Sequence, residues 1–203
     1  NYREVLEKVV GTKEAAEPFC YIPTEGVRDI LKPYLLYVGN AYPHKNLSIF
    51  LAVAKRFSEV RFVLVGKEDF FYRALKLAVV EAGIGNVVFA GYVSDPELGG
   101  LYKNATAYVF PSLYEGFGLP PLEAMQYGAP VIASDRGSLP EILGEAALYF
   151  DPTEEEDLCN KIEHILRDSA LREKLSLEGY RQVAKYSWQR MAKLTLKEYQ
   201  KIT

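Results

Sequence analysis

Cysteine and histidine are scarce in this sequence, with two of each among 203 residues. Cys20 and Cys159 lie far apart and neither has a CxxC-like neighbour, which argues against a disulfide framework and against a zinc site. His44 and His164 have no metal-ligating partners at a suitable spacing. The cysteine usage fits a reducing compartment best, so we expect a cytoplasmic protein.

An excess of basic residues is also missing. The 24 Lys and Arg residues are outnumbered by 27 Asp and Glu residues, giving a formal net charge of −3. This balance gives no support for a general affinity to nucleic acid, although local basic patches are compatible with it. No apolar run approaches the length of a membrane span.

The first residues of the chain lack the features of a secretory signal, because Asn1 to Glu7 are charged and amphipathic. An initiator Met is absent too, which indicates a fragment or a processed chain. The alternative is a trimmed form of a protein that is complete in itself. Composition does not separate the two.

What the chain does contain is a series of short apolar runs between longer periodic segments. Each run is nearly continuous rather than alternating, as expected for strands buried on both faces of a parallel sheet. The runs occupy residues 34–38, 62–65, 87–89, 107–110, 131–133 and 148–150.

Apolar residues between these runs recur with the i, i+3, i+4, i+7 spacing of one helix face. Two segments show this spacing clearly: Leu47, Phe50, Leu51 and Ala54, then Phe71, Ala74, Leu75 and Ala78. Gly83 is expected to stop the second helix. Strands that alternate with helices over short connections predict an α/β fold, a Rossmann-like doubly wound parallel sheet followed by C-terminal helices.

Two flanks fall outside this alternation, which divides the chain into residues 1–32, 33–185 and 186–203. The first part contains one helix-like stretch and then a connector punctuated by proline and glycine. From residue 154 onward the pattern is helical, and acidic residues 154–157 begin the first of these helices. We assign those carboxylates to the positive end of a helix dipole, in preference to catalysis.

Ligands of a doubly wound sheet bind beyond the carboxyl ends of its strands, so the loops after the apolar runs are the informative ones. The loop after Val38 begins with Gly39, which lets a ligand approach the backbone, and reaches Lys45 just before the helix near Leu47. A cation beside free N–H groups at a helix N-terminus suits a phosphate. The alternative is a solvated loop lysine, and this loop alone does not decide between them.

The loop after Phe110 carries the richest pattern, over residues 111–123. Two glycines free the backbone to curl around an anion, and two prolines prepare a helix start: Gly116, Gly118, Pro120 and Pro121. Glu115 in the loop and Glu123 in the predicted first helical turn can each accept hydrogen bonds from a sugar's vicinal hydroxyls. A helix-dipole role would explain Glu123 alone, but neither Glu115 nor the paired glycines.

Two further loops carry weaker signals. Gly91-Tyr92-Val93 could present backbone groups to a base, and Gly66-Lys67 could flank the ligand, but each alone fits an ordinary turn better. The sequence contains no Walker loop, GxGxxG fingerprint or serine-hydrolase elbow.

Taken in order, these loops resemble the C-terminal, donor-binding domain of retaining GT-B glycosyltransferases, specifically glycosyltransferase family 4. The resemblance covers roughly residues 20–203 and extends well beyond the E-x7-E segment that joins Glu115 to Glu123. Its other stretches are Tyr34-Leu-Leu-Tyr-Val-Gly39 with Lys45-Asn46-Leu47, Phe62-Val-Leu-Val-Gly66, Val88-Phe-Ala-Gly-Tyr-Val-Ser94, Gly128-Ala-Pro-Val-Ile-Ala-Ser134 with Leu139-Pro-Glu-Ile142, and Tyr186-Ser-Trp188.

The resemblance implies a nucleotide-diphosphate-sugar donor, GDP- or UDP-linked, whose hexosyl group (mannose or glucose type) passes with retention to a glycan or lipid-linked acceptor. The family usually works without a metal, so we expect neither a metal nor another cofactor. Positive groups and a helix dipole then stabilise the leaving diphosphate in place of Mg²⁺.

The resemblance also assigns a role to individual residues. Lys45 and Glu115 are the catalytic candidates, with Lys45 on the diphosphate and Glu115, together with the backbone of residues 116–119, on the transferring sugar and its phosphate. Glu123 holds the ribose hydroxyls, and Tyr92 and Val93 lie near the base. The remaining donor-binding candidates are Asn40, His44, Gly66, Ser112, Gly116, Phe117, Gly118 and Leu119.

The sequence departs from the family pattern in two ways. Asn40 and His44 occupy the positions where the family usually supplies an arginine, which implies either a weaker diphosphate clamp or a contribution from protonated His44. We also expect the family's N-terminal domain to be missing from this sequence, because residues 1–32 resemble only its last helix and the interdomain linker. Residues 33–185 would then be the nucleotide-sugar-binding domain and residues 186–203 the helix that returns to the N-terminal domain.

Because the family's acceptor site lies in that N-terminal domain, we expect the isolated chain to bind a nucleotide weakly and to transfer little or no sugar. Peripheral association with the inner face of a membrane would reside mainly in the same domain. Two alternatives remain open. One is a stand-alone nucleotide-binding or regulatory module that works with a separate acceptor-binding subunit, and the other is a different Rossmann-like enzyme, such as an epimerase of GT-B architecture.

Overall fold

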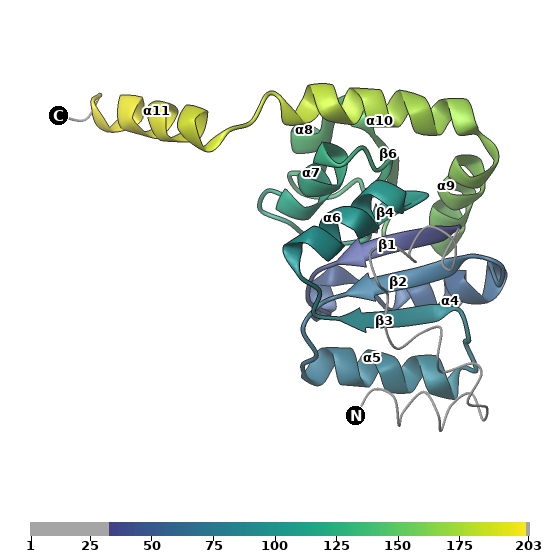
Figure 1. Cartoon of the computed structure of the whole chain (residues 1–203). Coiled ribbons are helices and arrows are strands. Elements are labelled where there is room, and N and C mark those ends of the chain that lie inside the picture. The colour runs from purple at the N-terminus through teal and green to yellow at the C-terminus, as the bar shows by residue number, and fades with distance from the viewer. Residues whose placement is uncertain (1–32, 202–203) are drawn as a thin grey trace.

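In the computed structural model of the protein, which describes residues 33–201, six strands form one parallel sheet (Figure 1). The strands are β1 (Tyr34–Val38), β2 (Arg61–Val65), β3 (Val87–Gly91), β4 (Ala107–Phe110), β5 (Val131–Ser134) and β6 (Ala147–Phe150). They confirm the six predicted runs to within two residues at each end. The helix-like stretch, connector and Cys20 predicted within residues 1–32 lie outside the described residues.

The strand order β3-β2-β1-β4-β5-β6 confirms the Rossmann-like doubly wound fold. After β3 the chain crosses over to the other side of β1, so the order reverses between β1 and β4. Ligands of such sheets bind in the crevice outside the carboxyl ends of the strands at this switch point. The loops that follow β1 and β4 are therefore the ones placed to form a site.

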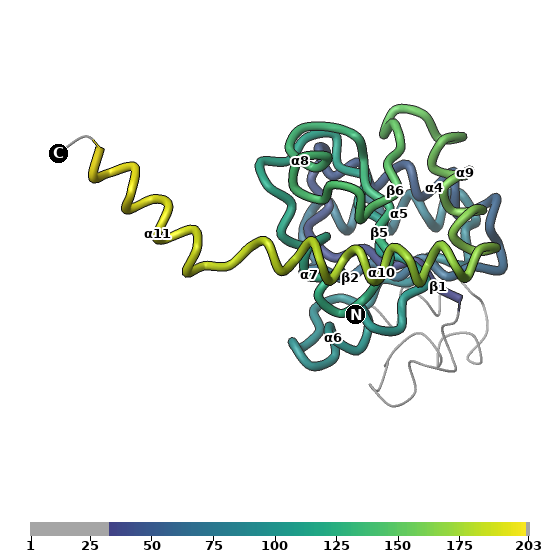
Figure 2. Tube along the Cα trace, turned by 90° about the horizontal axis from the view of Figure 1, so that it is seen from above, coloured from purple at the N-terminus to yellow at the C-terminus, as the bar shows by residue number. Residues whose placement is uncertain are grey.

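Helices cover both faces of the sheet, which is why every residue of β4 and β5 is buried. Figure 2 shows the two layers from above. One layer contains α4 (Ile49–Arg56), α5 (Phe70–Glu81) and α9 (Glu155–Arg167), and the other contains α6 (Asp95–Asn104), α7 (Leu119–Gln126) and α10 (Ser169–Val183). Within these layers α4 packs on α9 and α7 packs on α10.

The first helix after β1 starts later than predicted. A short 3-10 helix, η1 (Pro43–Lys45), comes first, and α4 begins only at Ile49. The predicted inward face holds for Leu47, Phe50 and Ala54, which are buried. Lys45 therefore lies in its own turn ahead of α4 rather than directly at the N-terminus of that helix.

The predicted inward face of α5 is correct for Leu75, which packs against the core, and wrong for Phe71 and Ala74. Tyr72 and Val79 are the buried residues of this helix, whereas Phe71 and Ala74 are exposed. The carboxylate of Asp69 caps the helix by accepting a hydrogen bond from the Tyr72 backbone N–H at 2.9 Å, and this cap sets the rotation of the first turn. The predicted stop is confirmed, because Gly83 adopts a left-handed conformation with φ +66° directly after the helix.

Apart from strand β6, the secondary structure described after β5 is helical. After β5, the short helices α8 (Leu139–Leu143) and η2 (Gly144–Ala146) lead to that strand. The predicted acidic start of α9 is confirmed, with residues 155–157 in its first turn. The final helix, α11 (Trp188–Tyr199), extends away from the body and buries none of its residues (Figures 1 and 2). None of the helices in residues 33–201 combines the length and apolar character needed to cross a membrane.

Candidate functional site

The loops after β1 and β4 meet at the switch point through their side chains and their backbones. The ammonium of Lys45 donates to Oε1 of Glu115 at 2.5 Å, across 70 residues of sequence. One residue earlier, the carbonyl of His44 accepts a hydrogen bond from the N–H of Leu113 at 2.7 Å. The structure thus joins the two loops that the sequence analysis singled out separately.

Lys45 is held on more than one side. Its Nζ lies 5.1 Å from the centre of the Phe110 ring, at a distance typical of cation–π contacts. Asn46 closes the 3-10 turn in a left-handed conformation (φ +56°), and its side-chain amide donates to the carbonyl of Pro152 at 2.8 Å. The Lys45 side chain is only 13% exposed, as is that of Glu115. The alternative of a fully solvated loop lysine is therefore wrong.

The backbone of Glu115 is supported by the loop that follows β5. Ser138 donates from its hydroxyl to the Glu115 carbonyl at 3.1 Å. Ser138 was not among the predicted site residues, although it lies next to the segment 139–142 on which the resemblance partly rests. No spacing in the sequence shows that the loops after β4 and β5 are neighbours, because that contact follows from the strand order.

Gly118 caps α7 directly ahead of Leu119 and of the two prolines that were expected to prepare the helix start. It caps the helix in a left-handed conformation with φ +93°, which disfavours any residue with a side chain. A Cβ atom at this position would lie 2.7 Å from a methyl carbon of Leu139. Gly116 differs, because a Cβ there would meet nothing within 4 Å.

Glu123 lies on α7 one residue beyond the first turn, so the predicted first-turn position is wrong. That placement weakens the helix-dipole interpretation, since the dipole effect is confined to the terminal turn. The carboxylate is exposed, and its Oε2 accepts a hydrogen bond from the hydroxyl of Tyr102 at 3.3 Å. Burial raises the pKa of the Tyr102 hydroxyl, and the charge of Glu123 raises it further, so Tyr102 remains a donor.

The other predicted residues also lie beyond the carboxyl ends of strands, with differing exposure. Asn40, His44, Gly116, Phe117 and Leu119 are exposed, Gly66 and Val93 are half-buried, and Tyr92 is 83% exposed. Gly66 follows β2 directly, and its N–H donates to the carbonyl of Gly91, the last residue of β3, at 3.0 Å. Among residues 33–201 no direct hydrogen bond joins Glu123, Tyr92 or Val93 to the Lys45–Glu115 pair.

Ser112 stands apart from these exposed candidates. It is fully buried, and its hydroxyl has no hydrogen-bond partner among residues 33–201. An unpaired buried polar group costs about 1–3 kcal/mol. This unpaired hydroxyl makes Ser112 an unusual position in the loop after β4. The sequence pattern did not indicate that the Ser112 hydroxyl would be buried without a partner among residues 33–201.

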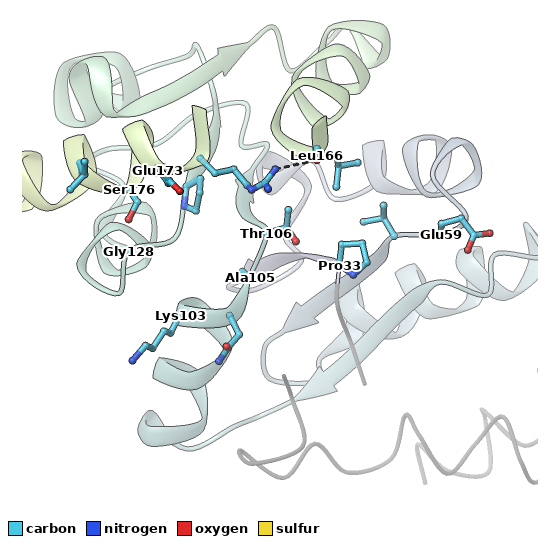
Figure 3. Close-up of a pocket in the computed structure, with 14 residues that line it drawn as sticks. Pro33, Glu59, Lys103, Ala105, Thr106, Gly128, Leu166, Glu173 and Ser176 are labelled. Carbon is cyan, nitrogen blue, oxygen red and sulfur yellow. Dashed lines mark hydrogen bonds between the residues drawn. The ribbon is translucent and has the colours of Figure 1, made fainter. Parts of the chain in front are cut away.

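A large open hollow lies at the amino-terminal ends of the strands, opposite the candidate site, and is separate from it (Figure 3). Its volume is about 1100 Å³, and its lining includes residues that precede β1, β2, β4 and β5: Pro33, Val60, Thr106 and Pro130. These positions are at the amino ends of the strands. The hollow therefore shares no residue with the loops that carry Lys45 and Glu115. Within the described part of the chain, no group of three or more His, Cys, Asp or Glu side chains gathers to hold a metal.

A Rossmann-like sheet with a lysine, two carboxylates and a glycine-capped helix at its switch point has the arrangement typical of domains that bind phosphate-containing ligands. Residues 27–182 match the family model described as glycosyl transferases group 1, and the chain belongs to this family. The resemblance to the C-terminal domain of GT-B enzymes of glycosyltransferase family 4 is thereby confirmed.

Relatives of known sequence and structure agree with this assignment. The chain is 34% identical over 175 residues to the O-antigen chain mannosyltransferase B of Escherichia coli, covering 82% of this chain and 45% of that protein. The sucrose-phosphate synthase of Thermosynechococcus elongatus superposes with a TM-score of 0.77 at 30% identity, covering 89% of this chain and 46% of the synthase.

Anabaena HepE, solved in complex with UDP and glucose, shares the fold with a TM-score of 0.74 at 19% identity, covering 91% of this chain and 54% of that protein. The chain thus spans about half the length of these relatives.

Proposed function

We propose that this chain is the donor-binding domain of a retaining hexosyltransferase, and that the Lys45–Glu115 pair is the centre of its donor site. The observation that carries the proposal is the position of this pair at the switch point, between the loops after β1 and β4. The donor would be a GDP- or UDP-linked sugar of mannose or glucose type. The names of the relatives, a mannosyltransferase and a protein solved with UDP and glucose, support that choice.

Lys45 can bind a diphosphate while it keeps its hydrogen bond to Glu115. An ammonium has three N–H donors, and one of them is directed to Glu115. The other two are available to phosphate oxygens. When the bond between the anomeric carbon and the diphosphate oxygen breaks, negative charge collects on the leaving diphosphate. A positive group already fixed beside it stabilises that charge without reorganisation.

Glu115 would orient the transferring sugar. Its Oε1 accepts from Lys45, and Oε2 has no hydrogen-bond partner among residues 33–201, so that oxygen can accept from a sugar hydroxyl. The N-terminus of α7, which begins directly after Gly118, would face the phosphates and add the positive end of its dipole. Gly116, Phe117 and Leu119 would supply the backbone of this pocket, and Ser112 lies in the same loop.

The nucleoside would extend from the pair along the carboxyl edge of the sheet. Glu123, held by Tyr102, would accept hydrogen bonds from the ribose hydroxyls. Tyr92 and Val93 would border the base, and the exposed Asn40 and His44 would flank the diphosphate beside Lys45.

A second domain would supply the acceptor site. Support comes from α11, whose large apolar side chains are exposed on a helix that touches little of the body: Trp188, Met191, Leu194, Leu196 and Tyr199 (Figure 2). Such a helix is suited to pack against a further domain. The proposed setting is cytoplasmic, with any peripheral contact to the inner face of a membrane made through that domain, where a lipid-linked acceptor would bind.

A thermal-shift panel tests the function directly. We expect UDP- or GDP-mannose or -glucose to raise the unfolding midpoint of the chain, because a ligand that binds only the folded state stabilises it by mass action. ADP-sugars serve as the comparison for base selectivity. Absence of any midpoint shift with all of these sugars at millimolar concentration would contradict the proposal.

A further inference from the structure

Three buried tyrosines hold the start of the loop that carries Lys45. Their hydroxyls donate to three consecutive carbonyls of the chain: Tyr108 to Val38 at 3.2 Å, Tyr72 to Gly39 at 2.8 Å and Tyr37 to Asn40 at 2.7 Å. We call Tyr37, Tyr72 and Tyr108 the tyrosine clasp. Each of the three side chains is at most 2% exposed.

The clasp draws its members from three different elements. Tyr37 belongs to β1, Tyr108 to β4 and Tyr72 to α5, so the loop is held from the sheet and from the helix layer together. A buried hydroxyl that loses its acceptor is costly, as is a buried carbonyl that loses its donor. The loop carbonyls and the tyrosine hydroxyls therefore fix each other's positions.

A second connection runs from the clasp to Lys45 through an aromatic ring. The rings of Tyr37 and Tyr108 both stack on Phe110, with centroid distances of 6.3 and 6.0 Å. The ammonium of Lys45 lies 5.1 Å from the centre of that same Phe110 ring. Displacement of the clasp would consequently move both the backbone that leads to Lys45 and the surface against which its ammonium rests.

Two glycines are required by this packing. A Cβ at Gly39 would lie 2.7 Å from the Tyr37 hydroxyl, and a Cβ at Gly66 would lie 2.5 Å from the Tyr72 hydroxyl and 2.1 Å from the Gly39 carbonyl oxygen. Gly39 was expected to let a ligand approach the backbone, and Gly66 was expected either to form an ordinary turn or to flank the ligand. The structure shows that side chains of the protein occupy the space beside them.

We infer that Tyr37, Tyr72 and Tyr108 are positioning residues for the donor site, which hold the loop after β1 so that the Lys45 ammonium is directed to the diphosphate. This inference rests on the proposed function. Lysine has a long flexible side chain, so its usefulness as a preorganised charge depends on how firmly its backbone is held. Burial raises the pKa of all three hydroxyls, so they stay protonated and act only as donors.

The test is a comparison of two Tyr→Phe substitutions that remove the same kind of bond at different places. Tyr72→Phe removes a hydroxyl of the clasp. Tyr34→Phe is the matched control, because Tyr34 is equally buried and its hydroxyl donates to the carbonyl of Leu101 at 2.6 Å, away from the Lys45 loop. UDP and GDP are titrated into the full chain by calorimetry at a temperature well below both unfolding midpoints, so that the folded fraction stays close to one.

We expect Tyr72→Phe to weaken UDP or GDP binding about tenfold and Tyr34→Phe to leave it within about twofold, although both lower the unfolding midpoint. Tyr37→Phe replaces Tyr72→Phe if the latter fails to fold. Amide hydrogen exchange in residues 39–46 should become faster in the clasp variant and stay unchanged in the control. An affinity that falls equally in both variants, or falls in neither while the unsubstituted chain binds normally, overturns the positioning role alone. Absence of binding by the unsubstituted chain overturns the proposed function and the inference with it.

Discussion

The ammonium of Lys45 and the carboxylate of Glu115 form a hydrogen-bonded ion pair at the point where the strand order of the sheet reverses. Both side chains are 13% exposed, which is enough for contact with a ligand and low enough for water to screen the pair less than at an open surface. The pair carries a compensated charge, so it can be built into the fold without an isolated buried ion.

Lys45→Ala is expected to weaken UDP or GDP binding at least about a hundredfold, on the order of 3 kcal/mol, because it removes a charge-assisted donor and leaves Glu115 unpaired beside the phosphates. Isothermal calorimetry measures the change. Lys55→Ala is the control, since Lys55 is an exposed lysine in the last turn of α4, far from the loops of the site. Equal affinity of the Lys45 variant and the unsubstituted chain would remove Lys45 from the site.

Glu115→Gln should affect the sugar more than the nucleotide. The substitution keeps an acceptor for Lys45 but removes a negative charge close to the diphosphate, so UDP or GDP should bind as tightly as before or a few times more tightly. The extra affinity that the sugar contributes should fall, because the amide is a poorer acceptor for its hydroxyls. Titrations of the nucleoside diphosphate and of the matching nucleotide sugar separate the two effects. A parallel loss for both ligands would argue against a sugar contact.

Glu123→Ala should remove the preference of the site for a ribonucleotide over the matching 2′-deoxyribonucleotide. If the carboxylate accepts from both ribose hydroxyls, the unsubstituted chain should prefer UDP over 2′-deoxy-UDP (or the guanine pair, whichever base binds) about tenfold, at the usual worth of a charged hydrogen bond. In the variant the two affinities should become nearly equal. The 2′-deoxy ligand serves as the control, because it lacks one of the hydroxyls that Glu123 would hold. A preference for the ribonucleotide that survives the substitution would assign the ribose contact to another residue.

Gly66→Ala should destabilise the fold by about 1–3 kcal/mol, toward the upper end of the usual cost of overpacking, because the new methyl would meet a backbone carbonyl as well as the Tyr72 hydroxyl. Gly85→Ala is the matched control. A Cβ there meets nothing within 4 Å, so the change should be neutral or slightly stabilising. Urea unfolding compares the two variants, and similar midpoints would contradict the close packing.

Asp151 should contribute stability that disappears in acid. Hydrogen bonds from the Thr153 hydroxyl and backbone N–H, and then the guanidinium of Arg136, lower its pKa to about 2. Because the folded pKa lies below the usual value near 3.9, the stabilisation is present above about pH 4 and is lost as the pH falls through about 2. The difference in unfolding free energy between the unsubstituted chain and Asp151→Asn should therefore shrink toward zero between pH 4 and pH 2. A constant difference over that range would exclude this linkage.

The predictions that succeeded are those that depend on neighbours along the chain. Continuous apolar runs identified all six strands, because both faces of a parallel strand must be apolar wherever helices cover them. Local chemistry also identified Gly83 as a helix stop and the two prolines of the loop after β4 as part of a helix start. The predicted domain boundaries at residues 32 and 185 stay predictions.

The predictions that failed concern how a helix is rotated about its axis and where it starts, which the spacing of residues along the chain does not determine. Neighbouring residues of α5 form two apolar stripes: the predicted one with Phe71 and Ala74, and a second one with Tyr72 and Val79. The cap by Asp69 and the acceptors available to the Tyr72 hydroxyl selected the second stripe. Glu123 was placed in the wrong turn of α7 for a related reason, because the start of a helix after two glycines is set by backbone geometry rather than by spacing.

The sequence by itself determined the class of the domain, the order of its elements and the two loops that carry charge. Those properties follow from periodicity and from residue types within short windows. Only the tertiary structure decided that Lys45 and Glu115 touch, that Ser138 supports Glu115 and that three tyrosines hold the loop leading to Lys45. The physical reason is the strand order, which places the carboxyl ends of β1 and β4 side by side although about 70 residues separate them. Buried hydroxyls must then donate to the carbonyls that this packing places within reach, as Tyr108 does to Val38.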